Sequence, residues 1–523
     1  MVARLRQSRW YWLSLALGVE VFFVMELMLN GLSRCDKYLY LSIMTNTPFF
    51  PAWRARLASM GQRVHRLRRQ SLMHLDTLFG PLLPVGLLAQ ADEGPNSREH
   101  IYSVRRTFFG FLYQMLNPDC PCREVVRQIQ SLFSLSSRRR VSPETGAYCL
   151  ARGRLPLDAL ARLRCAVAAD AAQAEPFWKG FRVKVVDGTS VSMPDTPKNQ
   201  CAYPQSAEQK PGCGFPFMKI VGVFSLATGA LLHYARGNKH QHELRLLHRL
   251  LDVFKPGDLV LADRGFNCYT LLALLWRKNV PALFRLHHAR SADLRQGKRL
   301  GKNDRLVTWR KPQDWQRRYL SRALWKLLAP ELPVRLLRFT LRRNGFRTRS
   351  VTLVTTLIDA QLYPAQDLAL LYARRWQIEL WFRDLKTSMG MEVLRCKSPP
   401  MIHKELEMFF IAYNLIRCLM LQASASHPVE IDRISFKGTV DTVRQFSAAL
   451  AQARSRKTQT RLIQTLLEAM ALDPVPDRPD RREPRAVKRR PKPCCWLTKP
   501  RHLFKDLQHR NRYWKTNPRT LWG

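Results

Sequence analysis

Two aspartates stand where an apolar run meets a glycine-containing turn. Asp187 opens an Asp-Gly-Thr sequence after residues 181–186, and Asp263 opens an Asp-Arg-Gly sequence after residues 258–262. We expect each run to form a β-strand. Two carboxylates at adjacent strand ends can hold a divalent cation between them. A single aspartate in such a place is more often a turn residue, so the pair alone leaves a metal site and two turns as open alternatives.

A third carboxylate, Glu379, lies on a long helix predicted over residues 365–387. At about 100° per residue, it falls in one stripe of the helix surface with five other side chains. The stripe contains Tyr372, Arg375, Trp376, Glu379, Arg383 and Lys386. The apolar side that can face a sheet contains Leu371, Ile378, Trp381 and Leu385. An exposed ion pair such as Glu379–Arg383 would explain the charges, but it would not explain the two aromatic rings beside them.

The predicted elements around the aspartates alternate in the order of a mixed-sheet α/β domain. After the first strand come a hairpin, a helix, the strand that ends at Asp263, another helix and another strand, at residues 217–235, 240–254, 258–262, 269–278 and 281–286. Residues 287–350 are basic and less regular, with strands expected at 306–309, 334–341 and 350–356. The Asn344-Gly345 pair predicts a hairpin turn there. We therefore expect a β-rich insertion at about 287–356, before the glutamate helix.

The spacing Tyr372-x-x-Arg375-x-x-x-Glu379-x-x-x-x-x-x-Lys386 resembles the Y-R-E-K signature of the insertion-sequence-four family of DDE transposases. The sequences that begin at Asp187 and Asp263 resemble that family's first and second aspartate motifs. The order Asp, Asp, insertion, Glu also matches, and the resemblance covers roughly residues 78–510. It implies an α/β fold with an RNase H-like catalytic core, a helical DNA-binding region before it and a basic helical or disordered tail after it.

The resemblance implies that Asp187, Asp263 and Glu379 are the catalytic carboxylates and bind two Mg²⁺ ions, with Mn²⁺ able to substitute. Phosphodiester transfer needs an activated oxygen nucleophile and a stabilised leaving oxygen, and two hard cations supply both. The implied activity is cut-and-paste DNA transposition. Water first frees a 3′-OH at the element end, and that 3′-OH later attacks target DNA. In family members a hairpin intermediate forms between these two steps.

The resemblance also implies a DNA-binding surface along the glutamate helix. Arg375 and Lys386 would hold phosphates near the scissile bond, and Arg383 would extend this basic surface. Tyr372 would contact a phosphate through its hydroxyl. Trp376 would stack on a flipped base, with core packing as its alternative. The implied partners are double-stranded DNA, both the terminal inverted repeats and the target, and a second copy of the chain in a synaptic homodimer.

The charge of the chain fits a nucleic-acid partner. Its 523 residues include 86 Lys and Arg against 40 Asp and Glu, a formal net charge of +46. Such a balance requires a polyanionic partner, and an acidic membrane surface is the other candidate. The 12 cysteines are scattered without a C-x-x-C pair, which argues against structural zinc and fits reduced thiols in a cytosolic protein. The family resemblance implies a prokaryotic cytoplasm, near the nucleoid. His240, His242 and Glu243 have two interpretations: ligands of a metal site, or residues near the start of a helix that bind no metal.

Four regions are expected: an apolar N-terminal extension at 1–45, a helical DNA-binding region at 46–175, the catalytic domain at 176–425 and a basic, partly disordered C-terminal region at 426–523. The second region carries arginines along its helices, among them Arg105, Arg106, Arg152, Arg154, Arg162 and Arg164. Residues 475–523 carry fifteen Lys and Arg against four Asp and Glu, which is typical of a tail that orders on phosphate.

Residues 10–32 are apolar enough to span a bilayer. They contain Glu20 and Glu26, and a carboxylate in mid-membrane is costly. The alternatives are an extension outside the working fold and a packed amphipathic helix, so a membrane partner is not expected. For the whole chain, a transposase-derived DNA-binding protein and an RNase H-like nuclease without mobility are the alternatives to a transposase.

Overall fold

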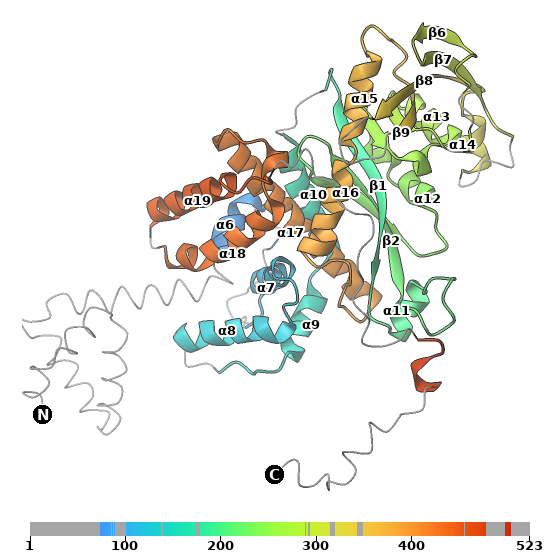
Figure 1. Ribbon diagram of the computed structural model, residues 1–523. Coiled ribbons are helices and arrows are strands. Elements are labelled where there is room, and N and C mark those ends of the chain that lie inside the picture. Colours follow the sequence, from blue (N-terminus) through green and yellow to red (C-terminus); the bar gives the residue numbers. More distant parts are fainter. Residues whose placement is uncertain are drawn as a thin grey trace, which may run out of the picture. The chain divides into compact units, whose positions relative to one another are not determined.

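The structure, a computed structural model, describes residues 74–84, 86, 88, 101–136, 140–173, 178–287, 289–290, 293–313, 320–341, 349–453, 455–476 and 497–503. The chain divides into two compact units, residues 1–70 with 131–140 and residues 71–130 with 141–523. The fold seen in Figure 1 belongs to the second unit. The predicted extension at 1–45 and most of the basic tail, at 477–496 and 504–523, lie outside the described residues.

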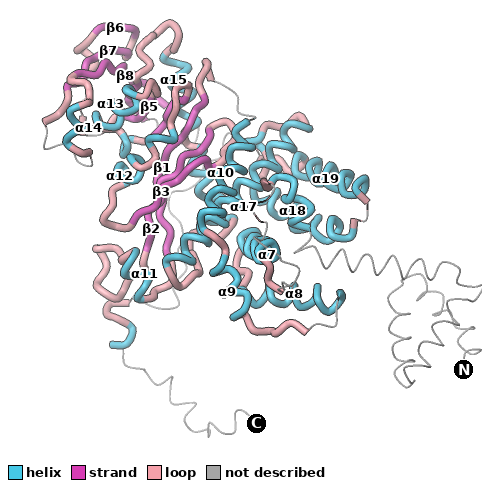
Figure 2. Tube along the Cα trace, turned by 180° about the vertical axis from the view of Figure 1, so that it is seen from behind, coloured by secondary structure: helices cyan, strands magenta, loops and turns pink. Residues whose placement is uncertain are grey.

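Among the described residues, nine strands form one mixed sheet in the order β3-β2-β1-β4-β5-β9-β8-β7-β6 (Figure 2). The strands are β1 (Arg182–Ser192), β2 (Phe217–Ser225), β3 (Leu231–Gly237), β4 (Asp258–Ala262), β5 (Ala282–Arg285), β6 (Lys298–Gly301), β7 (Asp304–Arg310), β8 (Glu331–Leu341) and β9 (Arg349–Thr355). β1, β4 and β5 run parallel, and the other pairings are antiparallel. The mixed α/β fold is confirmed, and β6 is a strand that the sequence pattern did not predict.

The β-rich insertion continues the central sheet. β9 pairs with β5, and β8, β7 and β6 follow it outwards. A buried ion pair between Arg335 of β8 and Asp304 of β7, with two N–H donors on the two carboxylate oxygens at 2.9 and 2.6 Å, joins neighbouring strands there. The predicted turn at Asn344-Gly345 lies outside the described residues.

Helices cover both faces of the sheet because its central strands are apolar on both sides. On one face, the helices and those packed on them share one hydrophobic core. They are α6 (His74–Phe79), α7 (Val104–Leu116), α10 (Leu157–Gln173), α15 (Ala365–Arg374), α16 (Gln377–Arg383), α17 (Pro399–Ser426), α18 (Phe436–Gln452) and α19 (Arg456–Ala471). The other face carries α12 (Glu243–His248), α13 (Tyr269–Arg277) and α14 (Arg322–Lys326). The remaining helices are α8 (Cys122–Ser136), α9 (Gly146–Arg154) and α11 (Pro197–Ala202).

Short non-α turns complete the described helices. They are the 3-10 turns η1 (Gly80–Leu82), η2 (Leu251–Val253), η3 (Arg264–Phe266), η6 (Ile431–Arg433) and η7 (Arg501–Leu503), and the π-helix η5 (Asp384–Ser388). The helix predicted over 240–254 is therefore shorter than expected, because it consists of α12 followed by η2.

Helix α17 is central to the larger hydrophobic core. It has 28 residues and packs against α7, α10, α18 and α19. Within the part of the chain that the structure describes, it is the one helix long and apolar enough to cross a membrane, and 78% of its most apolar window is buried inside the protein. That burial is typical of a core helix. The apolar segment 10–32 lies outside the described residues.

Some arginines of the N-terminal helices have structural roles instead of facing solvent. Arg164 is buried and pairs with Glu407 of α17 at 2.9 Å. Arg152 lies over the ring of Phe111 at 4.8 Å, and Arg106 is buried within α7. The expectation that the whole set faces DNA is therefore wrong for these residues. Arg154 and Arg162 remain exposed.

Candidate active site

Asp187 and Asp263 lie side by side on neighbouring parallel strands. β1 pairs with β4 up to Val186 opposite Ala262, and each aspartate is the next residue along the chain. Side chains alternate along a strand, so both carboxylates point to the face where α16 packs. β4 ends at Ala262 as predicted, but β1 does not end at Asp187. It continues to Ser192 because β2 keeps pairing with it.

The helix predicted over 365–387 is divided into three segments. α15 ends at Arg374, α16 begins at Gln377, and the π-helix η5 follows α16. The break at Arg375 and Trp376 uses shorter-range hydrogen bonds, Ile378 N to Arg375 O at 3.2 Å and Glu379 N to Trp376 O at 3.1 Å. Tight turns and π-segments both change the angular step of a helix. The six predicted side chains therefore do not share one exposed stripe.

Because of this break, the side chains of the signature lie in different environments. Tyr372 and Arg375 are buried, at 7% and 8% exposure, whereas Trp376 is 53% exposed. The Arg383 side chain is 63% exposed. Lys386, inside the π-helix, lies 3.8 Å from Glu392. The predicted apolar side is confirmed, since Leu371, Ile378, Trp381 and Leu385 are all buried.

Arg375 connects two of the three predicted carboxylates. Its guanidinium lies 3.4 Å from Asp187 Oδ2 and donates to Glu379 Oε1 at 3.0 Å. Since the Arg375 side chain is only 10% exposed, this arrangement holds Glu379 against the sheet at Asp187. Asp263 and Glu379 both act electrostatically on Asp187, so both carboxylates lie near it.

The environment of Asp187 disfavours its negative charge. Burial raises the pKa of Asp187 to about 6, and the nearby charges of Asp263 and Glu379 add to that rise. The Gly188 N–H, which donates to Asp187 Oδ1 at 2.8 Å, and the Arg375 guanidinium act in the opposite direction. A carboxylate in this position gains from any added positive charge.

We expect Asp187→Asn to stabilise the metal-free protein at pH 7. Because the pKa of Asp187 is raised from 3.8 to about 6 on folding, the folded protein keeps a proton that the unfolded chain has released between those values. The stabilisation from protonated Asp187 is thus complete below about pH 4 and is lost as the pH rises through about 6. The Asn variant should gain about 1–3 kcal/mol at pH 7 and little at pH 4.

Urea unfolding in EDTA at both pH values measures this difference. Asp252→Asn is the control, because the Asp252 side chain is 99% exposed and its pKa is lowered by Lys278. It should show no gain at pH 7. An equal gain in both variants would contradict the assigned role of burial at Asp187.

Tyr372 places a buried hydroxyl beside the carboxylates. Its ring centre lies 5.9 Å from the guanidinium carbon of Arg375, and burial raises its pKa. Among the described residues, its hydroxyl has no hydrogen-bond partner. Since buried polar groups are nearly always paired, this hydroxyl retains capacity for a ligand atom.

The donor set suits a hard divalent cation, since it consists of carboxylate oxygens. In the part of the chain that the structure describes, no three His, Cys, Asp or Glu side chains are arranged around one point as metal ligands. The Arg375 guanidinium lies between Asp187 and Glu379. The oxygen donors of the three carboxylates thus suit a cation by their chemistry, whereas their described arrangement does not surround one point and has the Arg375 charge between two of them.

Gly188 has a role that the sequence pattern did not predict. Its position faces α12, and a Cβ atom there would lie 2.4 Å from Glu243 Oε1. The glycine thus leaves room for the carboxylate of Glu243 within a continuous strand and does not form a turn. His242 caps α12, its Nδ1 accepting from Leu244 N at 3.2 Å. The helix-start interpretation of His242 and Glu243 is therefore confirmed.

Buried Asp384 was also missed by the sequence analysis. It lies in the π-helix, and burial raises its pKa to about 6. An Arg-Asp-Leu-Lys sequence gives no signal that its aspartate faces inwards, because that orientation follows from the π-turn.

Comparison with known proteins gives a family match and a related transposase. A family model described as "Transposase DDE domain" matches residues 178–415, a range that contains Asp187, Asp263 and Glu379. The transposase InsG for insertion sequence element IS4 of Escherichia coli (strain K12) is 29% identical over 384 residues, covering 71% of this chain and 82% of that protein. A solved piggyBac transposase synaptic complex with hairpin DNA has a TM-score of 0.38 and 9% identity, over 76% of this chain and 85% of that one. A structural likeness that weak supports no conclusion.

The matched domain and the site define the class of protein as a DDE transposase, an enzyme that cleaves DNA and transfers strands. Within that class, the chain has the Y-R-E-K spacing and is similar to the Escherichia coli transposase of insertion sequence element IS4.

Proposed function

We propose that this transposase cuts and joins DNA at the ends of its insertion sequence with Asp187, Asp263 and Glu379 as its catalytic carboxylates. The observation that carries the proposal is their convergence on one face of the sheet. The β1–β4 register brings the two aspartates together, and Arg375 holds Glu379 beside Asp187.

The three carboxylates would hold two Mg²⁺ ions, with Mn²⁺ as a substitute. Such ions, when bound, activate the attacking oxygen and stabilise the leaving oxygen. The protein's own contribution is a rigid frame, since Asp187 is fixed within a strand and Glu379 on a helix whose Ile378 and Trp381 are buried. Arg375 neutralises Asp187 and Glu379 in the absence of a cation and has further N–H donors for a phosphate oxygen.

Several side chains around the carboxylates would contact DNA. Trp376, at 53% exposure, has a free aromatic face that suits stacking on an unpaired base. Arg383 and Lys386 add positive charge along the same helical segment. The Tyr372 hydroxyl, which is buried without a partner among the described residues, would donate to a phosphate oxygen.

The wider assembly follows from charge and strand order. A net charge of +46 fits a prokaryotic cytoplasmic protein held near the nucleoid, with element-end and target duplexes as partners. The strands β3-β2-β1-β4-β5, an antiparallel meander followed by two parallel strands, would be the RNase H-like core. The helical region at 46–175 and the basic region at 426–523 would bind the element ends, in a homodimer that brings two ends together.

The test uses purified full-length protein and a duplex that carries DNA flanking the reading frame. Nicking at the element boundary with Mg²⁺, absent in EDTA, is the expected result. Binding without cleavage under both conditions would instead support a DNA-binding protein derived from a transposase. Cleavage without preference for the boundary would support a nuclease without mobility.

Lys386→Ala should weaken binding to the element-end duplex and lower the slope of log affinity against log salt by about one. The reason is the loss of one cation that contacts phosphate. Lys386 is 25% exposed and lies near a more exposed Glu392. Glu392→Gln is the control, because it frees Lys386 and should not lower the slope. An unchanged slope in Lys386→Ala would remove Lys386 from the DNA path.

A further inference from the structure

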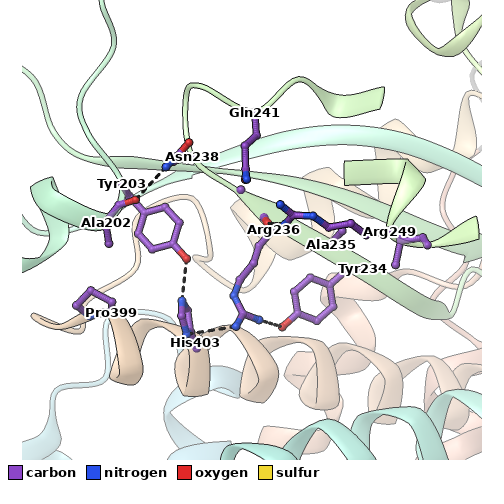
Figure 3. A pocket seen from close by; sticks show the side chains of 12 residues that line it. Ala202, Tyr203, Tyr234, Ala235, Arg236, Asn238, Gln241, Arg249, Pro399 and His403 are labelled. Carbon is purple, nitrogen blue, oxygen red and sulfur yellow. Dashed lines mark hydrogen bonds between the residues drawn. The ribbon is translucent and has the colours of Figure 1, made fainter. Parts of the chain in front are cut away.

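A polar pocket of about 520 Å³ opens at the edge strand β3 and the start of α17 (Figure 3). Its lining includes Arg236, Arg249, His403, Tyr203 and Tyr234. No aspartate or glutamate is among the described residues that line it, and among the described residues no carboxylate forms an ion pair with either arginine. The volume falls within the range of about 300–1,000 Å³ that is common for ligand sites.

Hydrogen bonds fix the side chains of the pocket in a row, as Figure 3 shows. One terminal nitrogen of Arg236 donates to the Tyr234 hydroxyl at 3.3 Å. The other terminal nitrogen lies 3.3 Å from His403 Nδ1. His403 Nε2 lies 2.7 Å from the Tyr203 hydroxyl. Tyr234 in turn donates to Glu407 at 2.8 Å, and Glu407 is held by buried Arg164. The row is thus anchored in the protein core.

The direction of each hydrogen bond follows from the chemistry of its donor. An arginine can only donate, so His403 Nδ1 accepts from Arg236, and a neutral His403 carries its proton on Nε2. The pKa of His403, lowered by burial and by Arg236 to about 4, agrees with the neutral form. His403 Nε2 therefore donates to the Tyr203 oxygen, and the Tyr203 O–H remains free to donate into the pocket.

The geometry points to a second DNA site, in which this pocket binds a phosphate of the DNA backbone through Arg236, Arg249 and the Tyr203 hydroxyl. This inference rests on the proposed function, since DNA is the phosphate source it names. Arg249 is exposed and donates to the Arg236 backbone carbonyl at 3.2 Å, and both arginines line the pocket. A pocket lined by two guanidinium groups and by no described carboxylate fits an anion, and the planar guanidinium suits phosphate oxygens.

Tyr234 and Arg236, which line the pocket at the edge of the sheet, lie on the same face of the sheet as the catalytic carboxylates. Asp187 is opposite Gly222, and Gly222 is opposite Tyr234; opposite residues in antiparallel pairs share a face. With strands about 4.8 Å apart and about 3.4 Å per residue, the Arg236 backbone lies about 12 Å from that of Asp187. Phe382 packs against Gly222 between them, so the two sites are separate.

That separation suits one DNA molecule that contacts both sites. One strand of a duplex rises about 3.4 Å per nucleotide, so about three to four nucleotides span the distance. A phosphate held in the pocket would fix the angle at which the duplex leaves the carboxylates.

The test measures binding of the full-length protein to a fluorescent element-end duplex at a series of salt concentrations. Arg236→Gln should lower the salt slope by about one unit, whereas Arg236→Lys, which keeps the charge, should preserve it. Arg249→Gln, at an exposed position, should also lower the slope, and it carries the test if Arg236→Gln does not fold. Lys278→Gln is the control with the same charge change. It lies on the opposite face of the sheet, paired with Asp252, and should leave the slope unchanged.

The outcomes separate the pocket from the proposed function. Wild-type binding with an unchanged slope in both Arg236→Gln and Arg249→Gln would overturn the pocket and leave the proposed function intact. Failure of the wild type to bind element-end DNA would overturn both. Calorimetry with inorganic phosphate distinguishes the ligand source. Phosphate binding that Arg236→Gln abolishes, with an unchanged DNA slope, would assign the pocket to free phosphate and overturn the DNA site.

Discussion

Replacing Asp263 with Asn should abolish DNA cleavage and leave DNA binding nearly intact. The substitution removes one carboxylate oxygen from a site where Asp187 lies on the adjacent strand. Metal-assisted stabilisation of a phosphodiester transition state is worth several kcal/mol, so cleavage should fall by about three orders of magnitude or more. Nicking of an end-labelled duplex, beside a binding titration of the same duplex, measures the two activities.

The matched control for this prediction is Asp252→Asn, at an exposed aspartate that follows α12 and pairs with Lys278. It makes the same chemical change away from the carboxylate site and should keep full cleavage. Equal loss of binding and cleavage in Asp263→Asn would indicate a folding defect, and retained cleavage would exclude Asp263 from the catalytic set.

Arg164→Ala should lower the free energy of unfolding more than any other single substitution proposed for this protein. Arg164 and Glu407 have side-chain exposures of 8% and 4%, so the substitution leaves an unpaired buried carboxylate. Breaking such a pair costs about 3–5 kcal/mol. The Leu232 carbonyl also loses a donor at 3.0 Å. The thermal unfolding midpoint, compared at one scan rate, should fall by about 3–5 °C.

Arg162, two positions earlier on the same helix, provides the control. It pairs with Asp158 at 3.4 Å, and both side chains are mostly exposed. Arg162→Ala should change stability by less than about 1 kcal/mol. Similar shifts for the two variants would show that the Arg164–Glu407 pair contributes no more than a surface pair. The double change Arg164→Met with Glu407→Leu should recover only part of the loss, because the Tyr234 hydroxyl loses its acceptor.

The sequence predicted the strands and turns that are bounded by residues close to them in the chain. β4 begins and ends where the apolar run 258–262 does, because Gly257 and the Asp-Arg-Gly sequence bound it on both sides. The β2–β3 hairpin and its turn at Gly229, which has a φ of 68°, followed in the same way. The three carboxylates were predicted because Glu379 lies in a known signature and the two aspartates lie in motifs that resemble those of the same family, and the β1–β4 register places the two aspartates side by side.

Features that depend on distant partners could not be predicted. Asp187 lies within a strand because β2 pairs with β1 beyond it, and no residue near Asp187 signals that pairing. The Arg375 guanidinium lies between Asp187 and Glu379, and its contact with Asp187, 188 positions away, has no signal in the local sequence. Arg164 looks like its exposed neighbours until Glu407, 243 positions away, lies beside it.

The continuation of the central sheet through β9 has a consequence for shortening this protein. Residues 282–284 of β5 are fully buried, and β5 hydrogen-bonds to β4 on one side and to β9 on the other. A deletion of 287–356 would leave β5 as an unprotected apolar edge, and such edges recruit strands from other molecules. The insertion is therefore not a detachable module, and its loss would lead to aggregation that starts one strand away from Asp263.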